Sequence, residues 1–128
     1  MVIRETKIMK KIVLVLAVMI SAFAASAQKM ASASAETLTK GKSSGVYVFT
    51  LPAEVTTEKV EELKKYYDHY FTTAFDQGKH EVKFTLTENE PLNRRVISRF
   101  MAGVEVKEYK VGDKTYASFD ALFDQYMK

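Results

Sequence analysis

The sequence predicts an α+β fold in which one antiparallel sheet carries two helices on one face. Stretches rich in β-branched and aromatic residues alternate with stretches whose apolar residues recur at helical spacing. Two of the strand-like stretches adjoin across a short turn signal, and this hairpin lies between the two helices. The 128 residues contain no cysteine, so a hydrophobic core must hold the fold without disulfides or thiolate metal sites.

The first 27 residues are typical of a secretory signal peptide. Lys10 and Lys11 precede the apolar run 12–25, and the sequence Ala-Ser-Ala at 25–27 suits signal peptidase, with cleavage before Gln28. The run is shorter than the roughly 20 apolar residues of a membrane-spanning helix, so an uncleaved anchor is the weaker alternative. We therefore expect an exported protein, periplasmic or secreted, without stable membrane insertion after cleavage.

The formal net charge of +3 comes from this leader. Residues 28–128 contain 15 Lys and Arg against 15 Asp and Glu, so the remainder is neutral. A neutral domain exerts no long-range attraction on a phosphate backbone. We therefore do not expect nucleic acid as a partner.

Residues 28–45 predict a flexible tether. They are mostly Ala, Ser, Thr, Lys and Gly, with almost no large apolar side chain. Such a segment buries too little surface to offset the entropy that it loses on ordering. We expect residues 46–128 to form a single α+β domain.

The first predicted strand covers residues 46–51, which are β-branched and aromatic, and Pro52 ends it. Thr56 and Thr57 are natural N-caps for the helix that follows, which should be about 12 residues long. One arc of this helix collects its apolar side chains, namely Val60, Leu63, Tyr66, Tyr67 and Tyr70.

A hairpin with Gln77-Gly78 as a two-residue turn should follow the helix. In that register Phe75 faces His80, Phe71 faces Phe84 and His69 faces Leu86. One face of the hairpin then holds the apolar residues Phe71, Phe75, Val82, Phe84 and Leu86. A slip of one residue would exchange the two faces, so this face should be the core face.

The second half of the chain repeats the pattern. A helix capped by Asn89 should end at Gly103, and a strand should cover residues 104–111. A turn at Gly112-Asp113, a short return strand and a last helix capped by Ser118 complete the chain. The order βαββαβ predicts a ferredoxin-like sandwich with one antiparallel sheet, plus a short C-terminal hairpin and helix.

Residues 46–111 resemble the heavy-metal-associated (HMA) domain of copper chaperones and metal-transporting ATPases. That family carries M-x-C-x-x-C between its first strand and first helix. Here the junction reads Val55-Thr56-Thr57-Glu58-Lys59-Val60, so Thr57 and Val60 stand at the two cysteine positions. Cu(I) needs soft sulfur ligands, which neither residue supplies. The resemblance therefore implies the fold and not the Cu(I) site.

The two histidines are the remaining candidate metal ligands. In the predicted register His69 and His80 lie roughly 17 Å apart along the strands, so they do not share one ion. Either histidine with a nearby carboxylate, Asp68 or Glu81, would form a weak Zn or Cu(II) site. We favour the interpretation that both lie at the sheet margin, with no metal and no cofactor.

Two groups of side chains are candidate interaction sites. Tyr66 and Tyr70 belong to an aromatic cluster, and tyrosine is a favoured interface anchor, although a core role is commoner. A basic strip on the second helix would dock an acidic partner or an anion, although a solvated face is commoner. The strip consists of Arg94, Arg95 and Arg99.

Catalytic patterns are missing from the sequence. It contains no Gly-rich phosphate loop, no H-E-x-x-H, no Asp-rich calcium loop and no serine spaced for activation by His and Asp. We therefore expect no enzyme but an exported, non-catalytic binding module on an HMA-like scaffold. It would bind a protein partner or form a homodimer by pairing at a sheet edge. The alternative is a periplasmic heavy-metal-binding or metal-chaperone-like protein with non-Cys ligands.

Overall fold

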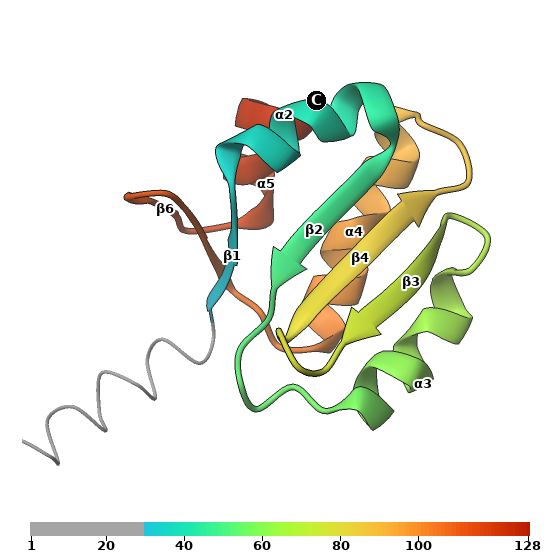
Figure 1. Cartoon of the computed structure of the whole chain (residues 1–128). Helices are drawn as coiled ribbons and strands as arrows, with labels where there is room; N and C mark the ends of the chain where they lie inside the picture. Colours follow the sequence, from blue (N-terminus) through green and yellow to red (C-terminus); the bar gives the residue numbers. More distant parts are fainter. Residues whose placement is uncertain (1–29) are drawn as a thin grey trace, which may run out of the picture.

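The computed structural model describes residues 30–128, and the predicted signal peptide lies outside the described residues. Residues 30–128 form an α+β fold with four α-helices and a six-stranded mixed sheet (Figure 1). The strands are β1 (Met30–Ala33), β2 (Val46–Thr50), β3 (Phe71–Asp76), β4 (Glu81–Leu86), β5 (Glu108–Val111) and β6 (Lys114–Tyr116). The helices are α2 (Ala35–Ser44), α3 (Thr57–Tyr67), α4 (Pro91–Gly103) and α5 (Phe119–Leu122), and α5 continues into the π-helical turn η1 (Phe123–Met127).

The strand order β3-β4-β2-β1-β5-β6 corrects the predicted single antiparallel sheet. Strands β2, β3, β4 and β5 are those expected from the βαββαβ order. Strand β1 lies between β2 and β5, antiparallel to β2 and parallel to β5 over four residue pairs. The sheet is therefore mixed. Strand β6 pairs with β5 and forms the other edge of the sheet within the described residues.

The prediction of a flexible tether is wrong for residues 30–44, which form β1 and α2. Ser34 caps α2 by accepting a hydrogen bond from the Thr37 amide at 3.1 Å, and Leu38 is fully buried. Ala31 is also fully buried, in the strand that lies between β2 and β5. Counting large apolar residues underestimated the surface that this segment buries.

The hairpin is confirmed, but its predicted register is wrong by two residues. Phe71 pairs with Leu86 and Phe75 with Val82, because the turn comprises four residues rather than two. His80 lies in this turn with a positive φ of 58° instead of facing Phe75 in the ladder, and His69 precedes β3. A shift of two residues leaves every side chain on its face, so the predicted core face is correct.

Among the three helices that the sequence predicts, only α4 starts differently. Thr56 caps α3 and Ser118 caps α5, each accepting a backbone hydrogen bond at 3.2 Å. Asn89 is not the cap of α4; Glu90 occupies that position without a side-chain bond, and the Asn89 amide donates to the Lys42 carbonyl at 2.7 Å. The Asn89 side chain bonds to the end of α2 and therefore does not cap α4.

The strand predicted over residues 104–111 begins only at Glu108. Glu105 takes a left-handed backbone conformation with φ of 64°, which interrupts an extended chain. The amide of Val106 donates to the Met101 carbonyl at 3.0 Å, so residues 104–106 close the end of α4. Val104 and Val106 are buried there rather than in the sheet.

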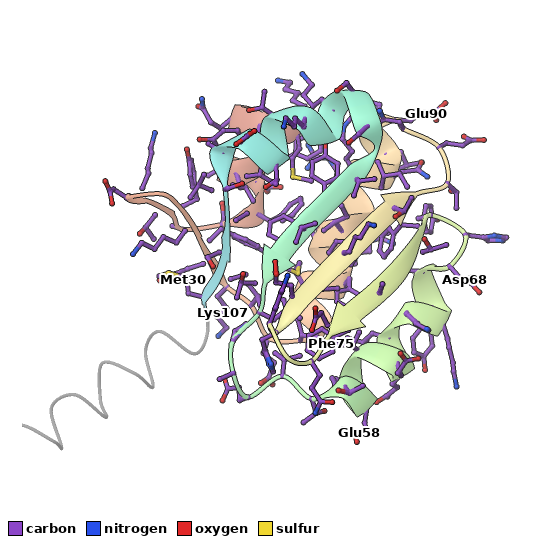
Figure 2. The ribbon with its side chains drawn as sticks, in the orientation of Figure 1. Met30, Glu58, Asp68, Phe75, Glu90 and Lys107 are labelled. Carbon is purple, nitrogen blue, oxygen red and sulfur yellow. The ribbon has the colours of Figure 1, made fainter. Side chains whose placement is uncertain are left out.

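Helices α3 and α4 cover one face of the sheet, as expected. The Phe71 ring packs against Tyr67 of α3 at a centroid distance of 6.0 Å and against Phe100 of α4 at 6.4 Å. Phe84 lies between Phe71 and Phe100, at 4.9 and 5.0 Å. The opposite face is open and carries mainly polar residues (Figure 2). Its exposed members on the hairpin are Thr72, Ala74, Asp76, Lys83 and Thr85.

A substitution at Gly41 tests the packing of α2. Glycine to alanine in a helix normally stabilises by about 1 kcal/mol. A methyl group at Gly41 would overlap the fully buried Tyr47 ring, so we expect Gly41→Ala to lower the free energy of unfolding by about 2 kcal/mol. Ser43→Ala on the exposed side of α2 is the control and should not destabilise. Urea denaturation measures both, and a stabilised Gly41→Ala protein would contradict the packing.

Candidate functional site

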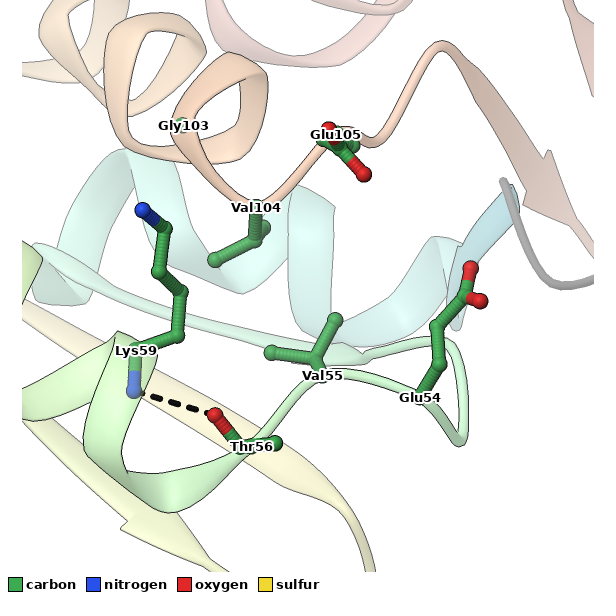
Figure 3. Close-up of a pocket in the computed structure, with 7 residues that line it drawn as sticks. All are labelled: Glu54, Val55, Thr56, Lys59, Gly103, Val104 and Glu105. Carbon is green, nitrogen blue, oxygen red and sulfur yellow. Dashed lines mark hydrogen bonds between the residues drawn. The ribbon is translucent and has the colours of Figure 1, made fainter.

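The loop between β2 and α3 lines a surface hollow (Figure 3). The hollow lies between the start of α3 and the end of α4. Its lining consists of Glu54, Val55, Thr56, Lys59, Gly103, Val104 and Glu105. Thr57 and Val60 are not part of this lining. Val60 is buried in the core, and the Thr57 hydroxyl is buried without a hydrogen-bond partner among the described residues.

The hollow offers two carboxylates, Glu54 and Glu105, and one amine, Lys59. Figure 3 shows the Lys59 side chain running toward the last turn of α4, which has no basic residue of its own. A positive charge there complements the negative end of the helix dipole. Within residues 30–128 no three His, Cys, Asp or Glu side chains come together to hold a metal ion.

The two histidines lie at opposite ends of β3. His69 is exposed in the turn before β3, and its carbonyl accepts a hydrogen bond from the Thr87 hydroxyl at 2.8 Å. The His80 ring packs edge-on against Phe75 at 5.2 Å, with its Nε2 buried and without a described partner. The six residues of β3 separate the two rings, so they are not joined in one site.

The tyrosine cluster divides into packed and exposed members. Tyr67 and Tyr70 are half-buried against the core. Tyr66 is 71% exposed, contrary to the expectation that it shares the apolar arc of α3. Tyr66 lies at one end of that arc. Leu92 on α4 is also largely exposed, at 62%.

The structure does not contain the predicted basic strip. Arg94 is only 6% exposed, with Nε donating to the Met127 carbonyl at 2.6 Å and Nη1 to Asn89 Oδ1 at 2.8 Å. Arg95 pairs with Asp120 at 3.1 Å, and its guanidinium lies 4.3 Å from the centre of the Phe123 ring. Only Arg99 extends from α4 as a simple exposed cation. The prediction of a basic strip is wrong because the C-terminal helix packs against the side of α4 that we expected to face solvent.

Arg94 instead satisfies the carbonyl ends of two helices. Its Nε donates to the Met127 carbonyl at the end of η1. Its Nη1 donates to the side-chain oxygen of Asn89, and the side-chain nitrogen of Asn89 donates to the Lys42 carbonyl at the end of α2. The fully buried Tyr47 lies near this network. Burial raises the pKa of the Tyr47 hydroxyl, and the Arg94 charge partly opposes that rise. Arg94 is thus a structural residue rather than a docking residue.

The two edges of the described sheet differ. Strand β6 has three residues, and Lys114 lies over the Tyr116 ring at 5.2 Å. Strand β3 has six residues, pairs with β4 without a bulge, and contains no lysine and no proline. Lysine, proline, bulges and short length are the usual protections of an edge against added strands. Of these four features β6 has two and β3 has none; the one charged residue of β3 is Asp76, at its end.

The hydrogen bonds show which groups of β3 remain open. The Thr87 amide donates to the Tyr70 carbonyl at 3.0 Å, so Tyr70 and Thr87 form a hydrogen-bonded pair of the ladder. Such pairs alternate along antiparallel strands, so Thr72, Ala74 and Asp76 bond to β4. The intervening residues direct their N–H and C=O groups away from β4. We call this outward row, formed by Phe71, Thr73 and Phe75, the β3 edge.

Sequence reasoning named a sheet edge as a possible contact but did not say which one. The signal was present in the sequence Phe-Thr-Thr-Ala-Phe-Asp at 71–76, which has one charge, at its end.

No helix in residues 30–128 has the length and hydropathy to cross a membrane. Comparison of the chain with protein-family models, with curated proteins and with solved structures finds no match.

A pair of arginine substitutions tests the role of Arg94. Arg94→Ala leaves the Met127 carbonyl and the Asn89 amide oxygen without their donor, so we expect a loss of about 3 kcal/mol in the free energy of unfolding. Arg99→Ala on the same helix should change it by less than about 0.5 kcal/mol. Equal effects in urea denaturation would show that Arg94 is not buried as described.

Because Tyr109 is buried, the free energy of unfolding should fall at high pH. Burial raises the pKa of the Tyr109 hydroxyl far above its usual value near 10, so the unfolded chain loses this proton first. Above about pH 10 the unfolded state therefore binds fewer protons, and stability falls by up to about 1.4 kcal/mol per pH unit for this group. Tyr109→Phe should reduce that slope, whereas the exposed control Tyr66→Phe should not. Denaturation at a series of pH values between 9 and 11.5 measures the slope of the free energy of unfolding. Equal slopes for the two variants would contradict the burial of the Tyr109 hydroxyl.

Proposed function

We propose that this protein is an exported, non-catalytic interaction module that binds a partner protein by accepting an added strand at the β3 edge. The predicted signal peptide supports export. The observation that carries the proposal is the unprotected six-residue edge strand, since the other edge of the described sheet is short and carries Lys114. The unpaired N–H and C=O groups of such an edge readily pair with a strand of another chain.

The scaffold we propose is a ferredoxin-like sandwich of the HMA kind, enlarged by β1 and β6. The run β2-α3-β3-β4-α4-β5 supports it, since the four strands keep the order β3-β4-β2-β5 apart from the inserted β1. Both helices pack on one face through Phe71. This arrangement leaves β3 outermost, where a partner has access to it.

The chemistry of the edge suits backbone recognition. Each outward residue offers one N–H donor and one C=O acceptor to an extended segment. The neighbouring side chains on the open face, Thr72 and Ala74, are small and exposed, so they leave room for the side chains of the incoming strand. Affinity then comes from main-chain bonds, and specificity comes from the side chains of the partner.

Proline substitutions test the proposal. Thr73→Pro removes the central outward N–H, but it breaks no bond to β4, since proline is tolerated where the N–H faces away from the sheet. Thr115→Pro in β6 is the matched control at the opposite edge. The bait is the immobilised, exported protein, and the sample is an envelope-protein extract that includes a differently tagged second copy. We expect wild type to retain a partner, Thr73→Pro to retain about tenfold less, and Thr115→Pro to match wild type.

The proposal fails if wild type retains nothing, or if Thr73→Pro retains the partner as well as wild type does. Circular dichroism and thermal denaturation first establish that both proline variants fold. If Thr73→Pro does not fold, Thr72→Lys replaces it, with Thr85→Lys on the neighbouring β4 as its control. The same ranking applies: only the edge substitution should reduce binding.

A further inference from the structure

We propose that the open face of the sheet binds a neutral saccharide in a hollow beside the start of α2. This site is separate from the β3 edge and does not depend on the proposed function. The hollow has a volume of about 410 Å³ and is lined by residues of β1, β2, β4, α2 and the turn between β5 and β6. Four of its side chains carry a hydroxyl and one carries a carboxylate. The lining consists of Ser32, Ala33, Ser34, Thr37, Val48, Thr50, Glu81 and Gly112.

The register of the sheet sets polar side chains of the hollow in one row across the strands. Ser32 pairs with Thr50, and Thr50 pairs with Glu81. Paired residues point to the same face of a sheet, so these three side chains are neighbours on the open face. The row continues to Asp76 of β3 on one side and to Lys110 of β5 on the other. Strands lie about 4.8 Å apart, so the row from Glu81 to Lys110 is about 14 Å long, the length of a short oligosaccharide rather than of one sugar ring.

The hydrogen-bonding character of the row changes from one end to the other. The carboxylates of Asp76 and Glu81 only accept hydrogen bonds, and the ammonium of Lys110 only donates them. The hydroxyls of Ser32 and Thr50, between these ends, do both. A charged ligand that spans the row meets like charge at one end. Sugar hydroxyls both donate and accept, so a neutral saccharide can bond along the whole row.

The carboxylate of Glu81 lacks a positively charged partner. It is half-buried and takes part in none of the ion pairs within residues 30–128. Its neighbour on β3 is Asp76, and like charges directly opposite each other destabilise a ladder. A partly desolvated carboxylate gains from hydrogen-bond donors that bring no further negative charge. The hydroxyl groups of a sugar are donors of this kind.

The other lining residues give the hollow its shape. Ser34 and Thr37 bond to each other at 2.7 Å within the cap of α2, so Ser32 and Thr50 are the hydroxyls left for a ligand. Val48 is half-buried in the hollow and offers methyl groups to the C–H groups of a sugar ring. Apolar lining with a few placed polar groups is typical of small-molecule sites.

A matched pair of valine substitutions tests the site. Thr50→Val removes one hydroxyl from the hollow and keeps the shape of the side chain. Thr85→Val makes the same change on the open face of β4, outside the hollow. The ligands are three neutral trisaccharides, namely cellotriose, maltotriose and the trimer of N-acetylglucosamine. The positively charged trimer of glucosamine has the same skeleton as the last of these and serves as the charge control. Amide chemical shifts of the ¹⁵N-labelled protein measure binding, and the same spectra establish that both variants fold.

We expect a neutral trisaccharide to bind with a millimolar dissociation constant and to shift the amides of Ser32, Thr50 and Glu81. Thr50→Val should raise this constant about tenfold, whereas Thr85→Val should stay within about twofold of wild type. The inference is overturned if none of the three neutral trisaccharides binds at millimolar concentration, or if Thr50→Val binds as tightly as wild type. Binding of the glucosamine trimer alone also overturns it, because the carboxylates then hold a cation. None of these results bears on the β3 edge, which Thr73→Pro tests.

Discussion

The fold depends on the insertion of β1 between β2 and β5. Strand β1 is parallel to β5 along its whole length and meets β2 through Ser32 and Thr50. Within the sheet, strands β3, β4 and β2 are therefore joined to β5 and β6 only through the four residues of β1. Helix α2 then leads directly from β1 into β2 and packs on Tyr47 through Gly41, which secures β1 from its other end.

The strand order also determines which strands lie at the two edges of the described sheet. Because β1 and β6 extend the sheet on the β5 side, that side ends in a short strand with a lysine. Nothing in residues 30–128 extends the sheet beyond β3, so the long strand stays at the edge. Meanwhile the buried Arg94 joins the ends of α2, α4 and the C-terminal helix, which leaves no basic surface at that place. The binding that we propose therefore uses backbone amides rather than arginines.

The sequence predicted what depends on short periodicities and missed what depends on distant contacts. The core face of the hairpin, with Phe71 and Phe84, was predicted correctly because its alternation survives a two-residue shift. The caps Thr56 and Ser118 were predicted because capping is local. Strand β1 was missed because buried alanines resemble a linker in composition. The burial of Arg94 depends on Met127, 33 residues away, and the identity of the edge depends on the whole strand order.

Amide hydrogen exchange, resolved by residue, tests the position of β1 most directly. Within the sheet the amides of Ala31 to Ala33 should alternate between bonds to β2 and to β5. We expect the protected amides of β1 to exchange only with global unfolding, as slowly as those of β2 and β4. Exchange of β1 at the rate of an unstructured peptide, while β2 and β4 remain protected, would contradict the account. It would show that the N-terminal segment is the tether that its composition suggests.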